Sequence, residues 1–114
     1  MDEETKREIA KQIQEVLPAP ESIREDWHSL IIDTVLDRVW NRPGLAQRDK
    51  SLVTISALTV LNMPHELKLH MQRGLSNGLS QEEITEAVLH CAICGGFPAA
   101  VEGMRVAREL FDDT

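Results

Sequence analysis

The stretch SQEEITEAVLHCAICGG, residues 80–96, sets where one helix begins, where it ends and which reactive side chains it carries. Ser80 and Glu83 have the spacing of a capping box, in which each side chain bonds the backbone N–H of the other residue. Gly95 and Gly96 end the helix, because glycine adopts backbone conformations that other residues avoid. The sequence therefore predicts a helix over residues 80–94.

Helical signals continue on both sides of this stretch. Pro98 begins a last helix, and Pro64 opens an earlier one that runs to Asn77, with Gly78 free for the left-handed position. The inward residues of the last helix are expected to be Val101, Met104, Ala107, Leu110 and Phe111. The segment DKSLVTISALTVL, residues 49–61, is apolar or small on nearly every side, which suggests packing between subunits.

Two further helices are predicted toward the N-terminus. Asp2 can cap a first helix, which Pro18 and Pro20 end, and a second helix runs over residues 21–40 up to the turn NRPG, residues 41–44. The expected inward residues of the first are Ile9, Ile13 and Val16, and those of the second are Ile23, Trp27, Leu30, Ile31, Thr34, Val35 and Val39.

The whole chain is predicted to be one all-α domain of about six helices. Apolar residues recur at helical spacing, and no alternating strand pattern of useful length appears. With 114 residues the chain is too short for two domains of ordinary size. We therefore expect a single domain over residues 1–114, with residues 1–19 as a helical extension.

The charge and the hydropathy of the chain exclude several classes of partner. The net charge is −7, without a cluster of Lys and Arg, so DNA and RNA are not expected to bind. The chain starts with acidic residues and lacks the apolar run of ~20 residues that a membrane span needs. We expect a cytoplasmic protein with no membrane partner.

Three reactive side chains recur at helical spacing within the opening stretch. Glu86, His90 and Cys94 are successive i, i+4 neighbours, so they share one side of the helix, and Cys91 lies one turn before Cys94. A carboxylate can orient a histidine that moves a proton at a thiol. The C-terminal end of a helix disfavours a thiolate, however, so inert packing of both cysteines is an open alternative.

A second pair with the same spacing is Glu66 and His70, which is either functional or an exposed i, i+4 ion pair. A zinc site is a further hypothesis, in which the ligands would be His70, His90, Cys91 and Cys94. No second short-spaced pair completes a recognised zinc pattern, so we predict no metal site.

Four motifs together resemble the carboxymuconolactone decarboxylase family: RVWNRPGL at residues 38–45, H-x-x-x-x-L-x-N-G ending at Gly78, E-E-I-x-E at residues 82–86, and GGFPAAVEGMRVA at residues 95–107. The resemblance implies an all-helical fold like that of alkylhydroperoxidase D. It also implies a homo-oligomer, a trimer or a hexamer, that acts on a small molecule without a cofactor.

This family contains two chemistries, and the sequence departs from both. In its peroxidase branch a CxxC pair precedes the histidine that corresponds to His70, but Met63 and Glu66 stand in those places, and the assisting acid is replaced near Ser51. The decarboxylase branch commonly has Tyr where this chain has Cys94. The residues that match the polar motif of that branch are Glu66, His70, Asn77, Glu86 and His90.

Two enzymatic hypotheses and one non-enzymatic hypothesis follow. The favoured one is a thiol peroxidase that depends on a thiol reductant, in which Cys94 attacks, Cys91 resolves, His90 carries the proton and Glu86 orients the imidazole. The alternative is decarboxylation of a lactone, with His70 or His90 as proton donor and Arg42 as a clamp on the departing carboxylate.

Asn77, Arg42 and Trp40 are the candidate substrate-binding residues. The third hypothesis is a small-ligand-binding oligomer without catalysis.

Overall fold

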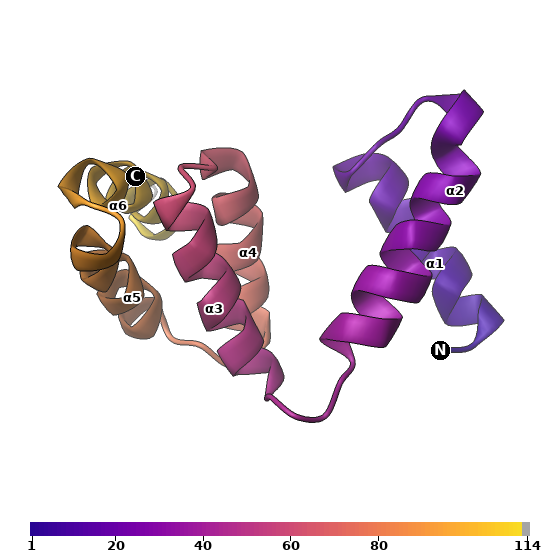
Figure 1. The fold of residues 1–114 in the computed structure, drawn as a ribbon, viewed down its shortest axis with the longest axis horizontal. Helices are drawn as coiled ribbons and strands as arrows, with labels where there is room; N and C mark the ends of the chain where they lie inside the picture. The colour runs from indigo at the N-terminus through magenta and orange to yellow at the C-terminus, as the bar shows by residue number, and fades with distance from the viewer. Residues whose placement is uncertain (113–114) are drawn as a thin grey trace. The chain divides into compact units, whose positions relative to one another are not determined.

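The computed structural model describes residues 1–112, which form helices joined by short loops (Figure 1). It contains six α-helices, one short 3₁₀-helix and one π-helix, and residues 1–112 include no strand. The prediction of an all-α protein is confirmed. The chain divides into two compact units, residues 1–44 and the residues from Leu45 onward, and each is described by itself. The single domain with an extension over residues 1–19 stays a prediction.

The N-terminal unit begins with α1 (Glu3–Val16). Its cap is Asp2, as predicted, since the backbone N–H of Thr5 donates to Asp2 Oδ1 at 2.8 Å. Residues 21–40 are helical in three successive hydrogen-bonding patterns: the 3₁₀-helix η1 (Glu21–Ile23), α2 (Arg24–Ser29) and the π-helix η2 (Leu30–Trp40). A small core holds the unit together and consists of Ile13, Ile31 and Ile32.

The predicted inward stripe of residues 21–40 is largely wrong. The consecutive residues Ile31 and Ile32 are buried, whereas Leu30 is 50% and Val39 is 56% exposed. A π-helix bonds each residue to the fifth one along, so a stripe with the α-helical period does not stay on one side. Val16 is also exposed, so only Ile13 of α1 reaches the core fully.

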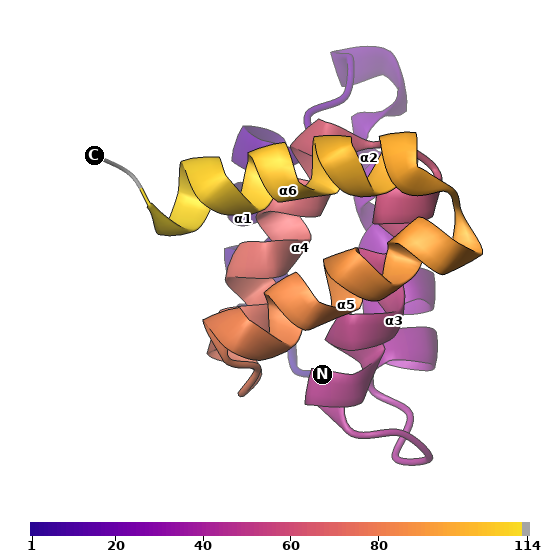
Figure 2. The same ribbon diagram turned by 90° about the vertical axis from the view of Figure 1, so that its left-hand side faces the viewer.

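The C-terminal unit contains four helices in two pairs, α3 (Gln47–Val60) with α4 (Pro64–Ser76), and α5 (Gln81–Cys94) with α6 (Phe97–Phe111). In Figure 2 the pair α5 and α6 crosses over the pair α3 and α4. Most of the apolar side chains in the core come from α4, α5 and α6. The core residues are Ile55, Leu67, Met71, Leu79, Ile84, Val88, Val106 and Ala107.

Most of the predicted helix boundaries in this unit are confirmed. The capping box of α5 has both of its bonds, with Glu83 N–H donating to Ser80 Oγ at 3.0 Å and Ser80 N–H donating to Glu83 Oε1 at 2.9 Å. Gly78 and Gly96 adopt φ values of 106° and 93°, in the region that favours glycine. Local sequence signals therefore determine the boundaries of α4, α5 and α6.

The buried side of helix α3 consists largely of small polar residues, although the helix also carries apolar ones. Its fully buried positions are Ser51, Ile55 and Thr59, one turn apart, while Val53 is 62% exposed. The buried hydroxyls are satisfied: Thr59 Oγ1 donates to the Ile55 carbonyl at 2.8 Å, and Ser51 Oγ accepts from Asn77 at 2.9 Å. Small side chains on the inner side of α3 let the neighbouring helices approach closely.

A close approach of this kind occurs at Gly103 of α6. A Cβ atom at this position would lie 2.8 Å from Val88 Cγ1 and 2.9 Å from Thr59 Cγ2. Overpacking a tight core costs about 1–3 kcal/mol, and the higher helix propensity of alanine offsets about 1 kcal/mol of this. Substitution Gly103→Ala is therefore expected to lower the free energy of unfolding by up to about 2 kcal/mol in urea titrations.

Gly44→Ala is the control for this substitution, because a Cβ atom at Gly44 would meet nothing within 4 Å. Its effect is expected to stay within about 0.5 kcal/mol. A Gly103→Ala variant that is about 1 kcal/mol more stable than the unmodified protein, as helix propensity alone predicts, would contradict the described packing of α6 on α3 and α5.

Candidate functional site

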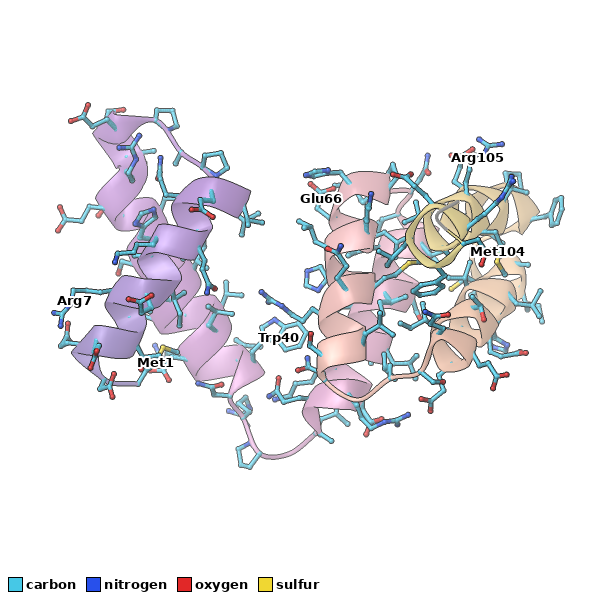
Figure 3. The ribbon with its side chains drawn as sticks, turned by 180° about the vertical axis from the view of Figure 1, so that it is seen from behind. Met1, Arg7, Trp40, Glu66, Met104 and Arg105 are labelled. Atoms are coloured by element: carbon cyan, nitrogen blue, oxygen red, sulfur yellow. The ribbon has the colours of Figure 1, made fainter. Side chains whose placement is uncertain are left out.

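The pair Glu66 and His70 lies on the flank of α4. The side of this helix that faces the core is formed by Leu67, Met71 and Gly74. Glu66 and His70 are half-buried, one turn apart, at the border between the core and the surface. Figure 3 shows Glu66 projecting from the first turn of α4, on the side away from α6. Both polar side chains are therefore partly shielded from water while remaining accessible.

The environment of His70 keeps its imidazole neutral near pH 7. Burial lowers the pKa of His70, the positive charge of Arg73 lowers it further, and the negative charge of Glu66 opposes both. The ordinary pKa of histidine is about 6.5. The imidazolium form of His70 is therefore a stronger acid than that of a solvated histidine.

Asn77, predicted to bind substrate, lies at the C-terminal cap of α4. Its side-chain Nδ2 donates to the buried Ser51 Oγ at 2.9 Å. This bond ties the end of α4 to the first turns of α3. A role of Asn77 toward substrate stays a prediction, and its bond in the structure is one that positions the helices.

Helix α5 presents its predicted residues to two different sides. Cys91 is buried with Ile84 and Val88, whereas Glu86, His90 and Cys94 are exposed. The predicted alignment of these three on one side of the helix is compatible with this pattern, but that side faces away from the core. The outer side of α5 also carries apolar residues, with Leu89 56% and Ile93 81% exposed.

An exposed apolar surface of this kind is typical of an interface. The predicted trimer or hexamer stays a prediction.

The two thiols are free, and they differ in environment. The Sγ atom of Cys91 lies 3.7 Å from the Ser56 carbonyl, to which it donates a weak hydrogen bond. Burial raises the pKa of the Cys91 thiol, with the bond to Ser56 acting in the opposite direction. Cys91 is therefore a protonated core thiol at neutral pH, an environment that suits packing better than disulfide exchange.

The C-terminal unit does not by itself bring the two acid and histidine pairs together. Helices α4 and α5 contact each other little, and His90 lies on the side of α5 that faces away from the core. Trp40 and Arg42 belong to the N-terminal unit, where Trp40 is half-buried and Arg42 is exposed. Their predicted part in binding substrate stays a prediction.

Three further features of the described residues concern ligands and membranes. A shallow, mainly apolar groove of about 440 Å³ lies beside the start of α6 and includes none of the predicted site residues. Its lining residues are Asn62, Phe97, Pro98, Ala99, Val101 and Glu102. Within residues 1–112, no three His, Cys, Asp or Glu side chains are grouped to hold a metal ion. In the same part of the chain, no helix is long and apolar enough to cross a membrane.

Comparison with known proteins places this helical chain in a family. Residues 25–109 match the model of the carboxymuconolactone decarboxylase family. The chain is 37% identical over 89 residues to 4-carboxymuconolactone decarboxylase of Acinetobacter baylyi, an alignment that covers 78% of this chain and 66% of that protein. It is also 37% identical over 84 residues to nitrosuccinic acid decarboxylase of Metarhizium robertsii, covering 74% and 59%.

A third relative is an uncharacterized 15.0 kDa protein of Paracoccus denitrificans, 30% identical over 76 residues. The chain covers between 57% and 66% of the length of these three relatives. The match to the family model spans most of the chain, so the protein belongs to the carboxymuconolactone decarboxylase family. The family predicted from the sequence motifs is confirmed.

Arg73 was not among the residues predicted from the sequence, although it lies one turn after His70. The charges around His70 lead to a prediction that nuclear magnetic resonance can check. Substitution Arg73→Gln removes a cation and should raise the pKa of His70, and Glu66→Gln removes an anion and should lower it. The His70 signal is assigned by its loss in His70→Gln. Shifts in the same direction for both variants, or no shift in either, would contradict the described surroundings of His70.

The thiols provide a second check, because Cys91 is 2% exposed and Cys94 is exposed. Titration of the native protein with a thiol reagent should show one fast and one slow thiol per chain. The fast phase should disappear in Cys94→Ser and remain in Cys91→Ala. Two equally fast thiols, or rapid loss of both on one equivalent of peroxide, would instead support the redox pair.

Proposed function

We propose that this protein is a decarboxylase of small organic acids and that His70, on α4, donates the proton that replaces the lost carboxyl group. The observation that carries the proposal is the half-buried His70 between Glu66 and Arg73. Membership of the family and the names of two relatives support the reaction type. The thiol peroxidase favoured from the sequence receives no such support, and Cys91 is buried.

The chemistry requires a proton and a place for an electron pair. Breaking the bond to the carboxylate releases CO₂ and leaves its electron pair on the substrate, which then takes up one proton. A lactone or a nitro group, as in the substrates named for the two relatives, can accept that pair. Such an acid supplies its own electron sink, so the remaining task of the protein is to bind, orient and protonate.

The described environment of His70 suits proton donation. Partial burial limits competing water, and the lowered pKa of His70 makes its imidazolium a ready donor. Glu66, one turn before His70, raises the pKa of the imidazole and can orient the ring in the charged form. Binding of an anionic substrate adds negative charge nearby, which favours protonation of His70 in the complex.

Release of CO₂ from 4-carboxymuconolactone and from nitrosuccinate by the purified protein tests this function. His70→Gln should lower kcat by about 10²–10⁴-fold, the usual contribution of a general acid. For the unmodified protein, kcat/KM should fall as pH rises through the pKa of free His70, which lies below the ordinary value of 6.5.

A double variant, Cys91→Ala with Cys94→Ser, is the control and should retain activity. Loss of CO₂ release in this double variant, with His70→Gln fully active, would contradict the proposal. Peroxide consumption that depends on Cys94, without CO₂ release from either acid, would replace it with the thiol peroxidase.

A further inference from the structure

Four polar side chains follow one another along the flank of α4. Glu66, His70, Arg73 and Asn77 are spaced by four, three and four residues, so they fall on one side of the helix. The core-facing residues of α4 lie about a quarter turn away around the axis. The stripe therefore offers an acid, an imidazole, a guanidinium and an amide in a row, of which Arg73 is the exposed member.

The guanidinium of Arg73 is available for a ligand. Several other cations of the C-terminal unit are in ion pairs: Arg48 pairs with Glu83 and Asp49, and Arg105 pairs with Glu102 at 2.6 Å. Among the described residues Arg73 forms no ion pair with a carboxylate.

The positive charge of Arg73 lowers the pKa of His70 and so opposes protonation of its imidazole. Among the charged side chains of the neighbouring helix α6, the carboxylate of Glu109 is paired with Lys68 of α4 at 2.8 Å. The residues that α3 buries against its neighbours, Ser51, Ile55 and Thr59, carry no charge. Arg73 is thus an unengaged cation one turn from the proposed proton donor.

A cation in this position helps decarboxylation only if it holds the correct carboxylate. Ion pairing with the departing carboxylate would stabilise the ground state more than the transition state, because the negative charge of that group is lost as neutral CO₂ forms. Pairing with a second carboxylate, which the product retains, orients the substrate and is equally strong throughout the reaction. Arginine suits this task, since its planar guanidinium binds a carboxylate through two parallel hydrogen bonds.

We propose that Arg73 binds the retained carboxylate of a dicarboxylic substrate and thereby places the other carboxylate, the one that is lost, beside His70. This inference rests on the proposed decarboxylase function and adds to it a residue that orients a substrate with two carboxyl groups. It assigns to Arg73 a role in binding and orientation, while the proton comes from His70. The clamp on the departing carboxylate that the sequence suggested for Arg42 is a different role, and it stays a prediction.

Binding and protonation are coupled in this arrangement. A carboxylate bound to Arg73 neutralises the charge that opposes protonation of His70, so the imidazole takes up a proton when the dicarboxylate binds. Binding of a dicarboxylate therefore increases the fraction of His70 that carries the proton to be donated.

The first test uses succinate, a dicarboxylate that lacks an activating group, as a binding probe. Saturating succinate should raise the pKa of His70 in the unmodified protein and in Arg105→Gln, the matched control on α6. In Arg73→Gln the pKa should already be higher and should not respond to succinate. No response in the unmodified protein, or an equal response in Arg73→Gln, would overturn the inference whether or not the protein proves to be a decarboxylase.

The second test is kinetic and separates binding from catalysis. With a dicarboxylic substrate, Arg73→Gln should raise KM by about 10- to 100-fold, as expected for loss of hydrogen bonds to a charged group, with a smaller fall in kcat from the lost orientation. Arg73→Lys should restore part of the lost affinity, because lysine keeps the positive charge but lacks the planar guanidinium. Decarboxylation with KM unchanged in Arg73→Gln would overturn the inference and leave the proposed function standing.

Discussion

The burial of one side of α4 is the constraint on which the candidate site depends. Leu67, Met71 and Gly74 pack into the core, and the helical period then fixes where the intervening residues lie. Glu66 and His70 are held at the border of the core, neither fully enclosed nor fully solvated. This partial burial is the largest cause of the lowered pKa of His70, so the chemistry of the side chain follows from the packing of its helix.

The parts of the fold that depend on local signals could be predicted from the sequence. The capping box at Ser80, the positive φ of Gly78 and the cap at Asp2 each rest on neighbours only a few residues away. The π-helix η2 could not be predicted in this way, because an amphipathic pattern assumes the α-helical step between residues. In α3, polar Ser51 and Thr59 take the buried positions because their hydroxyls find partners that hydrophobicity alone does not reveal.

The candidate site was only partly predictable for a related reason. Spacing correctly shows that Glu86, His90 and Cys94 share one side of α5, but it does not show whether that side faces the core. In the structure Cys91 takes the inner side, where burial raises the pKa of its thiol, an environment that suits packing better than disulfide exchange. Arg73 could have been found from the spacing of Glu66, His70 and Asn77, since the same period includes it.

Together these features favour decarboxylation that uses His70 of α4 over thiol chemistry that uses the cysteines of α5. The most direct measurement is the position of deuterium in the product formed when the protein decarboxylates its substrate in D₂O. If His70 delivers the proton, the unmodified protein places one deuterium on a single face of the protonated carbon, and the His70→Gln variant loses this selectivity. Deuterium on both faces with the unmodified protein, or unchanged selectivity in the variant, would show that the proton does not come from His70.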